Sequence, residues 1–285
     1  MKPSTAPSAQ PVHRVGQFAF RFPSPGQDLD QDHEWCEIKV EGDWRRIRFH
    51  DYDQIYSVPG LYEMLFYQWL KCTSPARVVG LLAEVMADFP QNADELRVLE
   101  LGAGNGMVGH ELRSIGVPYI LGADIIAQAK AAADRDRPGV YDRYLVADIT
   151  DISESQEAEI RQARLNCLVT VAALGFGDIP PEAFLAAYRM LDSPGWLAFN
   201  IKEDFLNEDA DPTGFSGLVR RMRRHGLIQI QAYRRYCHRL SVHGEPLYYV
   251  AIVATKNEEL PVGWWRPKRN QIAFGDPSSF TGIGE

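Results

Sequence analysis

The residues with the clearest chemical potential lie in one short stretch, where Glu100 is followed by Gly102, Gly104 and Gly106. Glycines this dense cost conformational entropy, so we expect a backbone that turns sharply and lets a ligand approach closely. The apolar residues before the turn predict a buried strand. Those after it predict a helix, whose first N–H groups and positive dipole end face the turn. We therefore predict a ligand site here.

The nature of the ligand depends on the carboxylate. Residues 104–109 match the pattern G-x-G-x-x-G, which holds a pyrophosphate in dinucleotide-binding folds. Glu100, at the end of the predicted strand, would repel a diphosphate, whereas it would attract an ammonium group. The turn alone leaves both interpretations open.

Two further predicted strands also end in an acid. Asp124 closes the strand expected at 119–124, a position at which either nucleotide-binding fold would hydrogen-bond a ribose. Asp148 lies at the end of the strand expected at 144–149, although an aspartate there could equally cap a turn. These acids support a nucleoside ligand.

The last third of the chain separates the two interpretations. After strands expected at 166–174 and 196–201, two long β-rich runs cover residues 227–242 and 246–256 and are joined by only three residues. So short a connection predicts an antiparallel hairpin. A dinucleotide-binding domain would instead add a parallel strand after a crossover helix. The hairpin therefore disfavours a dinucleotide fold.

Together, the Glu100-x-Gly102-x-Gly104-x-Gly106 stretch, the acid-ended strands and the hairpin resemble class I S-adenosylmethionine-dependent methyltransferases over about residues 96–256. The resemblance implies an α/β fold with a Rossmann-like, mostly parallel sheet of seven strands and a terminal antiparallel hairpin. It also implies S-adenosylmethionine as cofactor: Glu100 binds its ammonium, Asp124 its ribose, and Asp148 with Ile149 its adenine. The implied cofactor-binding residues are Tyr56, Glu100, Gly102, Ala103, Gly104, Gly106, Asp124, Ile125, Asp148, Ile149 and Ala172.

The regions flanking this core are expected to be additions. Residues 1–33 read as a flexible leader with one short strand, and residues 257–285 as a C-terminal extension of unassigned role. Residues 34–95 predict a β-hairpin followed by a helical lid. Tyr56 and its neighbouring tyrosines in the lid could contact the cofactor, or could simply pack.

The acceptor of the methyl group is not encoded in a motif. His50, Tyr56 and Glu203 are candidate general bases by expected position only. The Asp/Asn-Pro-Pro-aromatic motif of DNA amino-methyltransferases is missing. We expect a small-molecule acceptor, with three alternatives: a peptide or protein acceptor, a non-catalytic cofactor-binding partner subunit, and an NAD(P)-dependent oxidoreductase.

Composition limits the partners. The 285-residue chain carries a net charge of −8, so no general electrostatic attraction draws it to nucleic acid or anionic membranes. Its N-terminus lacks the apolar core of a signal peptide, and no apolar run is long enough for a bilayer. The four cysteines are scattered without metal-ligand spacing, so we expect no metal and a cytoplasmic protein with reduced thiols.

Overall fold

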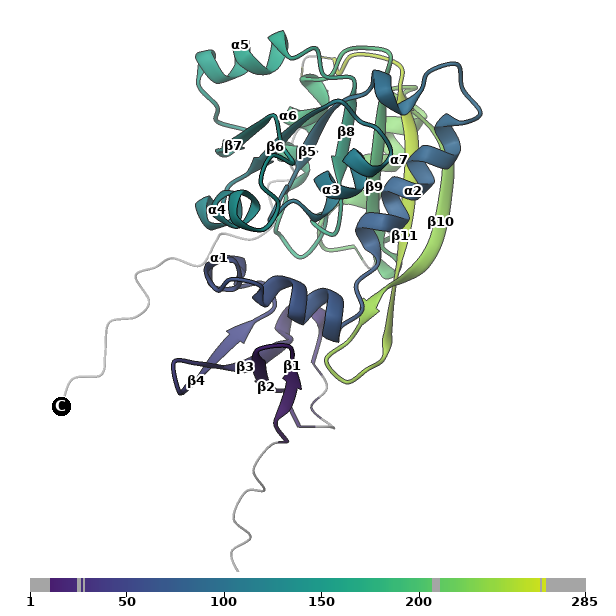
Figure 1. Cartoon of the computed structure of the whole chain (residues 1–285). Coiled ribbons are helices and arrows are strands. Elements are labelled where there is room, and N and C mark those ends of the chain that lie inside the picture. Colours follow the sequence, from purple (N-terminus) through teal and green to yellow (C-terminus); the bar gives the residue numbers. More distant parts are fainter. Residues whose placement is uncertain (1–10, 25–26, 28, 207–210, 262, 265–285) are drawn as a thin grey trace, which may run out of the picture.

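The computed structural model describes residues 11–24, 27, 29–206, 211–261 and 263–264. Two sheets make up the molecule, a large one with helices on both faces and a smaller N-terminal one beyond one end of its strands (Figure 1). The predicted ligand site at the glycine turn lies where these two parts meet, so the arrangement of the two sheets decides which residues form it.

The large sheet has seven strands in the order β10-β11-β9-β8-β5-β6-β7. Neighbouring strands from β9 to β7 pair in parallel, and β11 pairs antiparallel with both β9 and β10. The predicted fold class and the antiparallel hairpin are thereby confirmed. The strands are β5 (Arg97–Leu101), β6 (Tyr119–Asp124), β7 (Arg143–Val146), β8 (Cys167–Thr170), β9 (Gly195–Lys202), β10 (Ile228–Leu240) and β11 (Pro246–Lys256).

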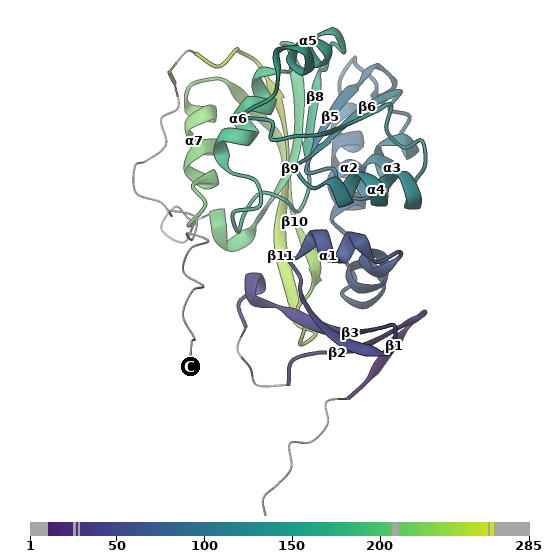
Figure 2. The ribbon, with the colours of Figure 1, turned by 90° about the vertical axis from the view of Figure 1, so that its left-hand side faces the viewer.

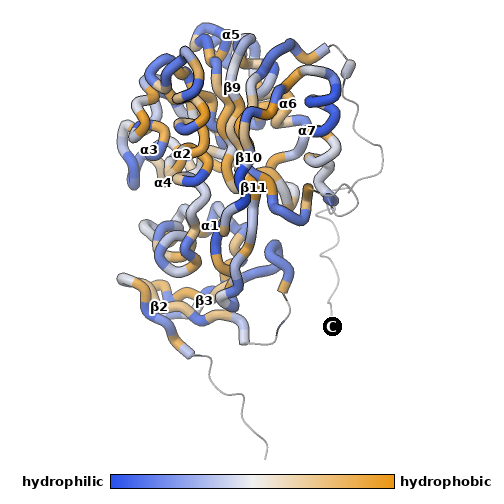
Figure 3. Tube along the Cα trace, turned by 90° about the vertical axis from the view of Figure 1, so that its right-hand side faces the viewer, coloured by the Kyte–Doolittle hydropathy of each residue, from blue (hydrophilic) through white to orange (hydrophobic). Residues whose placement is uncertain are grey.

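Helices cover both faces of this sheet (Figure 2). On one face lie α2 (Ser74–Met86), α3 (Met107–Ser114) and α4 (Ala127–Asp136). The other face packs against α5 (Glu154–Gln162), α6 (Pro181–Arg189) and α7 (Phe215–Arg224). Alternate side chains of β5 enter the two resulting cores, Leu99 on one side and Val98 on the other. Figure 3 shows hydrophobic residues along β9 and the strands beside it.

The N-terminal sheet contains four antiparallel strands in sequence order, β1 (His13–Val15), β2 (Phe18–Arg21), β3 (Trp35–Val40) and β4 (Asp43–Arg48). The expected hairpin is β3–β4. The two strands before it belong to the segment that was expected to be a leader, and Phe20 pairs with Ile38 across β2 and β3. Both side chains are fully buried, so burial of these aromatic and branched residues outweighs the polar composition around them.

Two short helices connect the two parts, α1 (Tyr52–Ser57) and the π-helix η2 (Glu63–Trp69). Three others are η1 (Gln31–His33) between β2 and β3, η3 (Ala93–Glu95) before β5 and η4 (Glu203–Leu206) after β9. The helix expected in the lid is continuous over residues 61–69, and it is π-helical from Glu63 to Trp69. The strand expected at 144–149 ends at Val146, since its partner β6 ends at Asp124, opposite that residue. Asp148 therefore lies in the following turn.

The hairpin β10–β11 extends past the other strands to the N-terminal sheet (Figures 1 and 2). Leu240 N–H donates to the Leu70 carbonyl at 2.7 Å, and Val242 packs into the N-terminal apolar core. Arg239 pairs with Glu34 at 2.6 Å, with both side chains almost fully buried. The hairpin thus fixes the N-terminal layer over the carboxyl ends of the parallel strands.

Parts of both predicted end segments lie outside the described residues, namely 1–10, 25–26, 28, 262 and 265–285. Within the C-terminal extension, Trp264 packs into the large core and Arg221 stacks on its ring, 4.5 Å from the centroid. No helix in the described part of the chain combines the length and apolar composition needed to cross a bilayer.

Candidate cofactor and acceptor site

A cavity of about 70 Å³ lies between the glycine turn after β5 and the N-terminal layer. Residues from both parts of the molecule line it. Among them are seven of the residues singled out in the sequence: His50, Tyr56, Glu100, Gly102, Ala103, Gly104 and Ala172. Ligand sites in open α/β sheets lie outside the carboxyl ends of the strands, as this cavity does.

The glycine turn requires its glycines. Gly102, Gly104 and Gly106 all have positive φ, at 73°, 53° and 85°. A Cβ on Gly104 would lie 2.5 Å from the Tyr56 hydroxyl oxygen. The turn therefore brings bare backbone against the cavity and the lid.

Glu100 is buried at the end of β5, and the two oxygens of its carboxylate differ in their hydrogen bonding. Tyr141 donates from its hydroxyl to Glu100 Oε2 at 3.0 Å, whereas Oε1 has no hydrogen-bond partner among the described residues. Burial raises the pKa of Glu100 well above its usual value, although the Tyr141 hydrogen bond acts in the opposite direction. A buried carboxylate oxygen without a partner is costly, so this position is suited to a cationic ligand group.

Asp124 ends β6 beside the same turn. Its Oδ2 accepts from the Gly104 N–H and its Oδ1 from the Ile126 N–H, both at 2.9 Å. Burial raises the pKa of Asp124, and these backbone hydrogen bonds oppose the shift. Each carboxylate oxygen keeps a second lone pair, so the group can position the turn and still accept from two vicinal hydroxyls.

The lid is attached to the glycine turn by a polar cluster. Glu63 Oε1, on η2, accepts from Asn105 Nδ2 at 2.6 Å and from Arg137 Nη1 at 2.8 Å. Arg137 also donates to the Asn105 carbonyl at 3.0 Å. In the same region, Tyr56 packs against Ala129 and Ala132 of α4. These contacts hold the lid closed over the turn.

Beyond β8, the chain adopts unusual backbone conformations as it passes the cavity. Ala172 has φ 56° and Phe176 has φ 53°, values rare for residues with a side chain. The Ala172 N–H donates to Oδ1 of the buried Asn200 at 2.7 Å, which holds this conformation. Asn200 in turn donates to the Tyr236 hydroxyl on β10. The edge of the cavity is thus fixed by the sheet behind it.

Six predicted site residues do not line the cavity, and one of them is Asp124, described above. Gly106 caps α3, and Ile125 is 66% exposed beside Asp124. The exposed Asp148 accepts from the Thr150 N–H and hydroxyl, which lowers its pKa, and Ile149 is buried in the large core. A role of these residues in cofactor binding stays a prediction. Glu203 pairs with Arg235 at 2.6 Å on the exposed side of η4, away from the cavity.

The structure adds one residue to the candidate base His50. Asp178, in the loop after β8, places its two carboxylate oxygens 3.3 and 3.2 Å from His50 Nδ1. The sequence assigns no role to Asp178, because its partner is 128 residues away. The glycines around it, Gly175 and Gly177, were the available signal of a special loop.

A second polar group closes the far side of the cavity, where His238 and Arg239 of β10 contribute to the lining. His238 Nδ1 lies 2.6 Å from the Ser74 hydroxyl, and burial lowers the pKa of His238 well below its usual value. Tyr249 accepts from Gln31 Nε2 at 2.8 Å. These side chains are engaged in contacts between the hairpin and the N-terminal segments.

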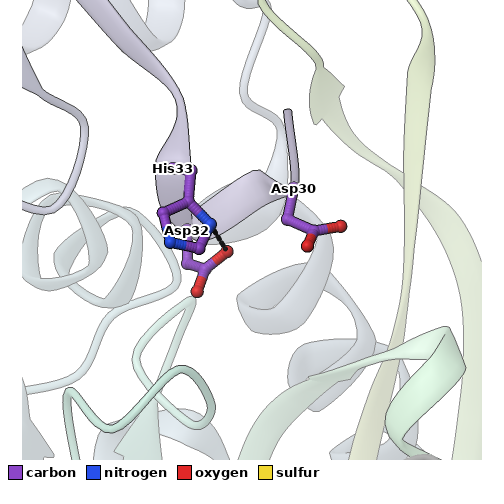
Figure 4. Close-up of side chains that lie close together, drawn as sticks. All are labelled: Asp30, Asp32 and His33. Carbon is purple, nitrogen blue, oxygen red and sulfur yellow. Dashed lines mark ion pairs between the residues drawn. The ribbon is translucent and has the colours of Figure 1, made fainter. Parts of the chain in front are cut away.

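One group of metal-ligand type was not expected from the sequence. Asp30, Asp32 and His33 place one potential ligand atom each within 4.8 Å of one another (Figure 4). His33 and Asp32 already form an ion pair at 3.0 Å, and His33 is largely exposed. None of the three lines the cavity.

Solved structures with a similar fold include several methyltransferases. The N-methyltransferase NodS from Bradyrhizobium japonicum WM9, in complex with S-adenosyl-L-homocysteine, aligns with a TM-score of 0.50 and 12% identity over 74% of this chain and 98% of that chain. A putative S-adenosylmethionine-dependent methyltransferase from Listeria monocytogenes aligns with a TM-score of 0.45 and 17% identity over 64% of this chain and 100% of that chain. Magnesium protoporphyrin IX methyltransferase from Synechocystis PCC 6803 aligns with a TM-score of 0.44 and 15% identity over 64% of this chain and 79% of that chain.

The likeness to NodS establishes the fold, which is the Rossmann-like fold of class I methyltransferases. No family model matches the chain, and no curated protein matches it in sequence.

Proposed function

We propose that this chain is an S-adenosylmethionine-dependent methyltransferase acting on a small-molecule acceptor. The observation that carries the proposal is Oε1 of Glu100 at the glycine turn, which has no hydrogen-bond partner among the described residues, inside a fold shared with a methyltransferase in complex with S-adenosyl-L-homocysteine. An ammonium group is the ligand that this oxygen lacks. A dinucleotide would place a diphosphate there instead, against a buried acid.

The residues at the turn fit the cofactor's parts. Glu100 would hold the ammonium, Gly102 and Gly104 leave backbone room, and Asp124 can accept from the ribose hydroxyls. The bound cofactor supplies an electrophilic methyl group on a positively charged sulfur. The protein's own task is then to orient an acceptor, exclude water and remove a proton.

The closed lid favours a small acceptor over a peptide or protein. Drug-sized ligand sites have volumes of about 300–1,000 Å³, several times the present cavity. The lid must therefore move to admit the cofactor. A cavity that is covered by aromatic lid residues suits a compact acceptor, because a peptide needs an open groove.

Calorimetric titration with S-adenosyl-L-homocysteine tests the proposal, with NADH as the comparison ligand. We expect saturable binding of the first ligand, loss of that binding in Glu100→Gln, and no binding of NADH. Binding of NADH alone would replace the proposal with an oxidoreductase. Saturable cofactor binding with no methyl transfer to any small acceptor would favour the peptide acceptor or the non-catalytic partner subunit.

A further inference from the structure

His50 and Asp178 come together in the cavity lining from distant parts of the chain. His50 follows β4, and Asp178 follows β8, yet their side chains meet at 3.2 Å and both line the cavity. Their side chains are only 17% and 26% exposed. A histidine whose Nδ1 contacts a carboxylate keeps Nε2 for another partner, and within the described residues His50 Nε2 makes no hydrogen bond.

We infer that His50 is the general base of the reaction, oriented by Asp178, and that the acceptor atom is a hydroxyl oxygen on a planar ring. This inference rests on the function proposed above. The Nδ1–H of His50 donates to Asp178, which fixes the ring and the tautomer, so Nε2 faces the cavity as the proton acceptor. An amine acceptor could attack as the free base, whereas a hydroxyl needs its proton removed.

The pair has more support than a surface ion pair would. Edge-on contacts hold the His50 ring between Tyr52 and Phe176, with centroids 5.7 and 5.5 Å away. Phe176 adopts its left-handed backbone conformation in the same loop that carries Asp178. Strained backbone of this kind persists where the surrounding structure requires it, often at functional sites. The loop thus keeps Asp178 in reach of His50.

The other candidate bases fit less well. Burial raises the pKa of Tyr56 well above its usual value, so this hydroxyl stays protonated and cannot accept a proton at neutral pH. Glu203 lies outside the cavity lining and is paired with Arg235. His238 lines the cavity, but its Nδ1 contacts a serine hydroxyl and no carboxylate, and burial lowers the pKa of this imidazole well below its usual value.

The lining around the dyad defines the shape of the acceptor. Phe49, Tyr52, Phe176 and Tyr249 line the same cavity as the dyad, and the rings of Tyr52 and Phe176 contact His50. Aromatic walls suit a flat apolar molecule, and a hydroxyl on its ring would be the polar group that reaches His50. The carboxylates and guanidinium in the cavity lining are Glu100, Asp178 and Arg239, the last already paired with Glu34.

Methyl transfer to the hydroxyl requires no reactant besides the cofactor and the acceptor. The acceptor oxygen attacks the methyl carbon, so that an O–C bond forms as the C–S bond breaks, with the bonding pair left on sulfur. The hydroxyl proton passes to Nε2 of His50, and Asp178 stabilises the resulting imidazolium. Solvent takes the proton after the products leave.

4-Nitrophenol is a suitable probe, since its phenolate is coloured and its phenol is not. We would titrate it, at a pH below its own pKa, into the full-length protein saturated with S-adenosyl-L-homocysteine. We expect the bound probe to ionise in the wild type, and the ionised fraction to fall at least tenfold in His50→Gln. Asp178→Asn should give an intermediate fraction, because the ring is then poorly held.

His33→Gln is the matched control, because His33 also pairs with an aspartate but lies outside the cavity lining. It should ionise the probe like the wild type. Absence of probe binding, probe binding without ionisation, or full ionisation in His50→Gln would overturn the inference. Loss of S-adenosyl-L-homocysteine affinity in His50→Gln would assign this residue to the cofactor instead. If the wild type binds no S-adenosyl-L-homocysteine at all, the proposed function itself fails.

Discussion

Two carboxylates in this protein are equally buried but differ in how they are satisfied. Glu34 and Glu100 are each 1% exposed. Glu34 accepts from Arg239 Nη2 at 2.6 Å and from the Val242 N–H at 2.5 Å, so both of its oxygens are used. Glu100 has one oxygen engaged by Tyr141 and one without a partner. The difference separates a carboxylate that closes an interface from one that is available to a ligand.

The largest expected effect is on the free energy of unfolding and comes from substituting Glu34, the carboxylate whose two oxygens are both hydrogen-bonded. Glu34→Gln removes the charge that compensates Arg239, and breaking a buried ion pair on one side costs about 3–5 kcal/mol. We expect the free energy of unfolding in urea to fall by this amount. Glu84→Gln is the control, because Glu84 pairs with Arg234 at the exposed surface and should change the midpoint little. Equal effects of the two substitutions would contradict the structural role of Glu34.

Substitution of Glu100, the carboxylate with one oxygen lacking a partner among the described residues, should change the affinity for the cofactor. Glu100→Gln keeps the size of the side chain but removes the charge that we assign to the cofactor's ammonium. Loss of one partner of a buried charge pair costs about 2–5 kcal/mol of affinity. Calorimetry with S-adenosyl-L-homocysteine measures this loss. Unchanged affinity would show that Oε1 of Glu100 does not meet the ligand.

Asp124 lies between these two cases, since its oxygens already accept two backbone N–H groups. Asp124→Asn should weaken binding of S-adenosyl-L-homocysteine by about 1.5–3 kcal/mol, the range for hydrogen bonds to a charged group. Asp148→Asn, measured in parallel, tests the predicted adenine contact. A loss for Asp148 would place the adenine there, whereas unchanged affinity would leave its carboxylate as the turn cap seen in the structure.

The smallest effect is on the stability of the ligand-free protein and depends on pH. Because burial raises the pKa of Glu100 in the folded state, its stabilising contribution is full below the ordinary carboxyl pKa and is lost as the pH rises through the raised value. Glu100→Gln should therefore be more stable than the wild type by about 1–2 kcal/mol at neutral pH. The difference should vanish in acid. Urea unfolding at several pH values checks the sign, and a variant that is less stable at neutral pH would refute it.

The sequence predicted the wall of the cavity that the sheet provides. Glu100 and the glycines lie within a few residues of one another, and each buried parallel strand is recognisable as an apolar run with a turn after it. Local patterns of this kind carry through to the structure, since neighbours in sequence remain neighbours in space. The antiparallel hairpin was predictable for the same reason.

The opposite wall could not be predicted in this way. Glu34 meets Arg239 across 205 residues, and His50 meets Asp178 across 128. Such pairs depend on how the N-terminal layer docks, which no local pattern encodes. β2 is the short strand expected in the leader, whereas β1 was missed because it is only three residues long and pairs with β2 alone. The early end of β7 was missed because it depends on β6.

The contact between Glu34 and the tip of the hairpin also has a consequence for synthesis. A ribosome completes β1–β4 and η2 long before Arg239 leaves the exit tunnel, and the apolar core of that layer is made almost entirely by its own residues. The layer can collapse early, while the carboxylate of Glu34 has to remain hydrated until its cation arrives. Closure of the cavity between the two parts is thus deferred until the hairpin has been synthesised.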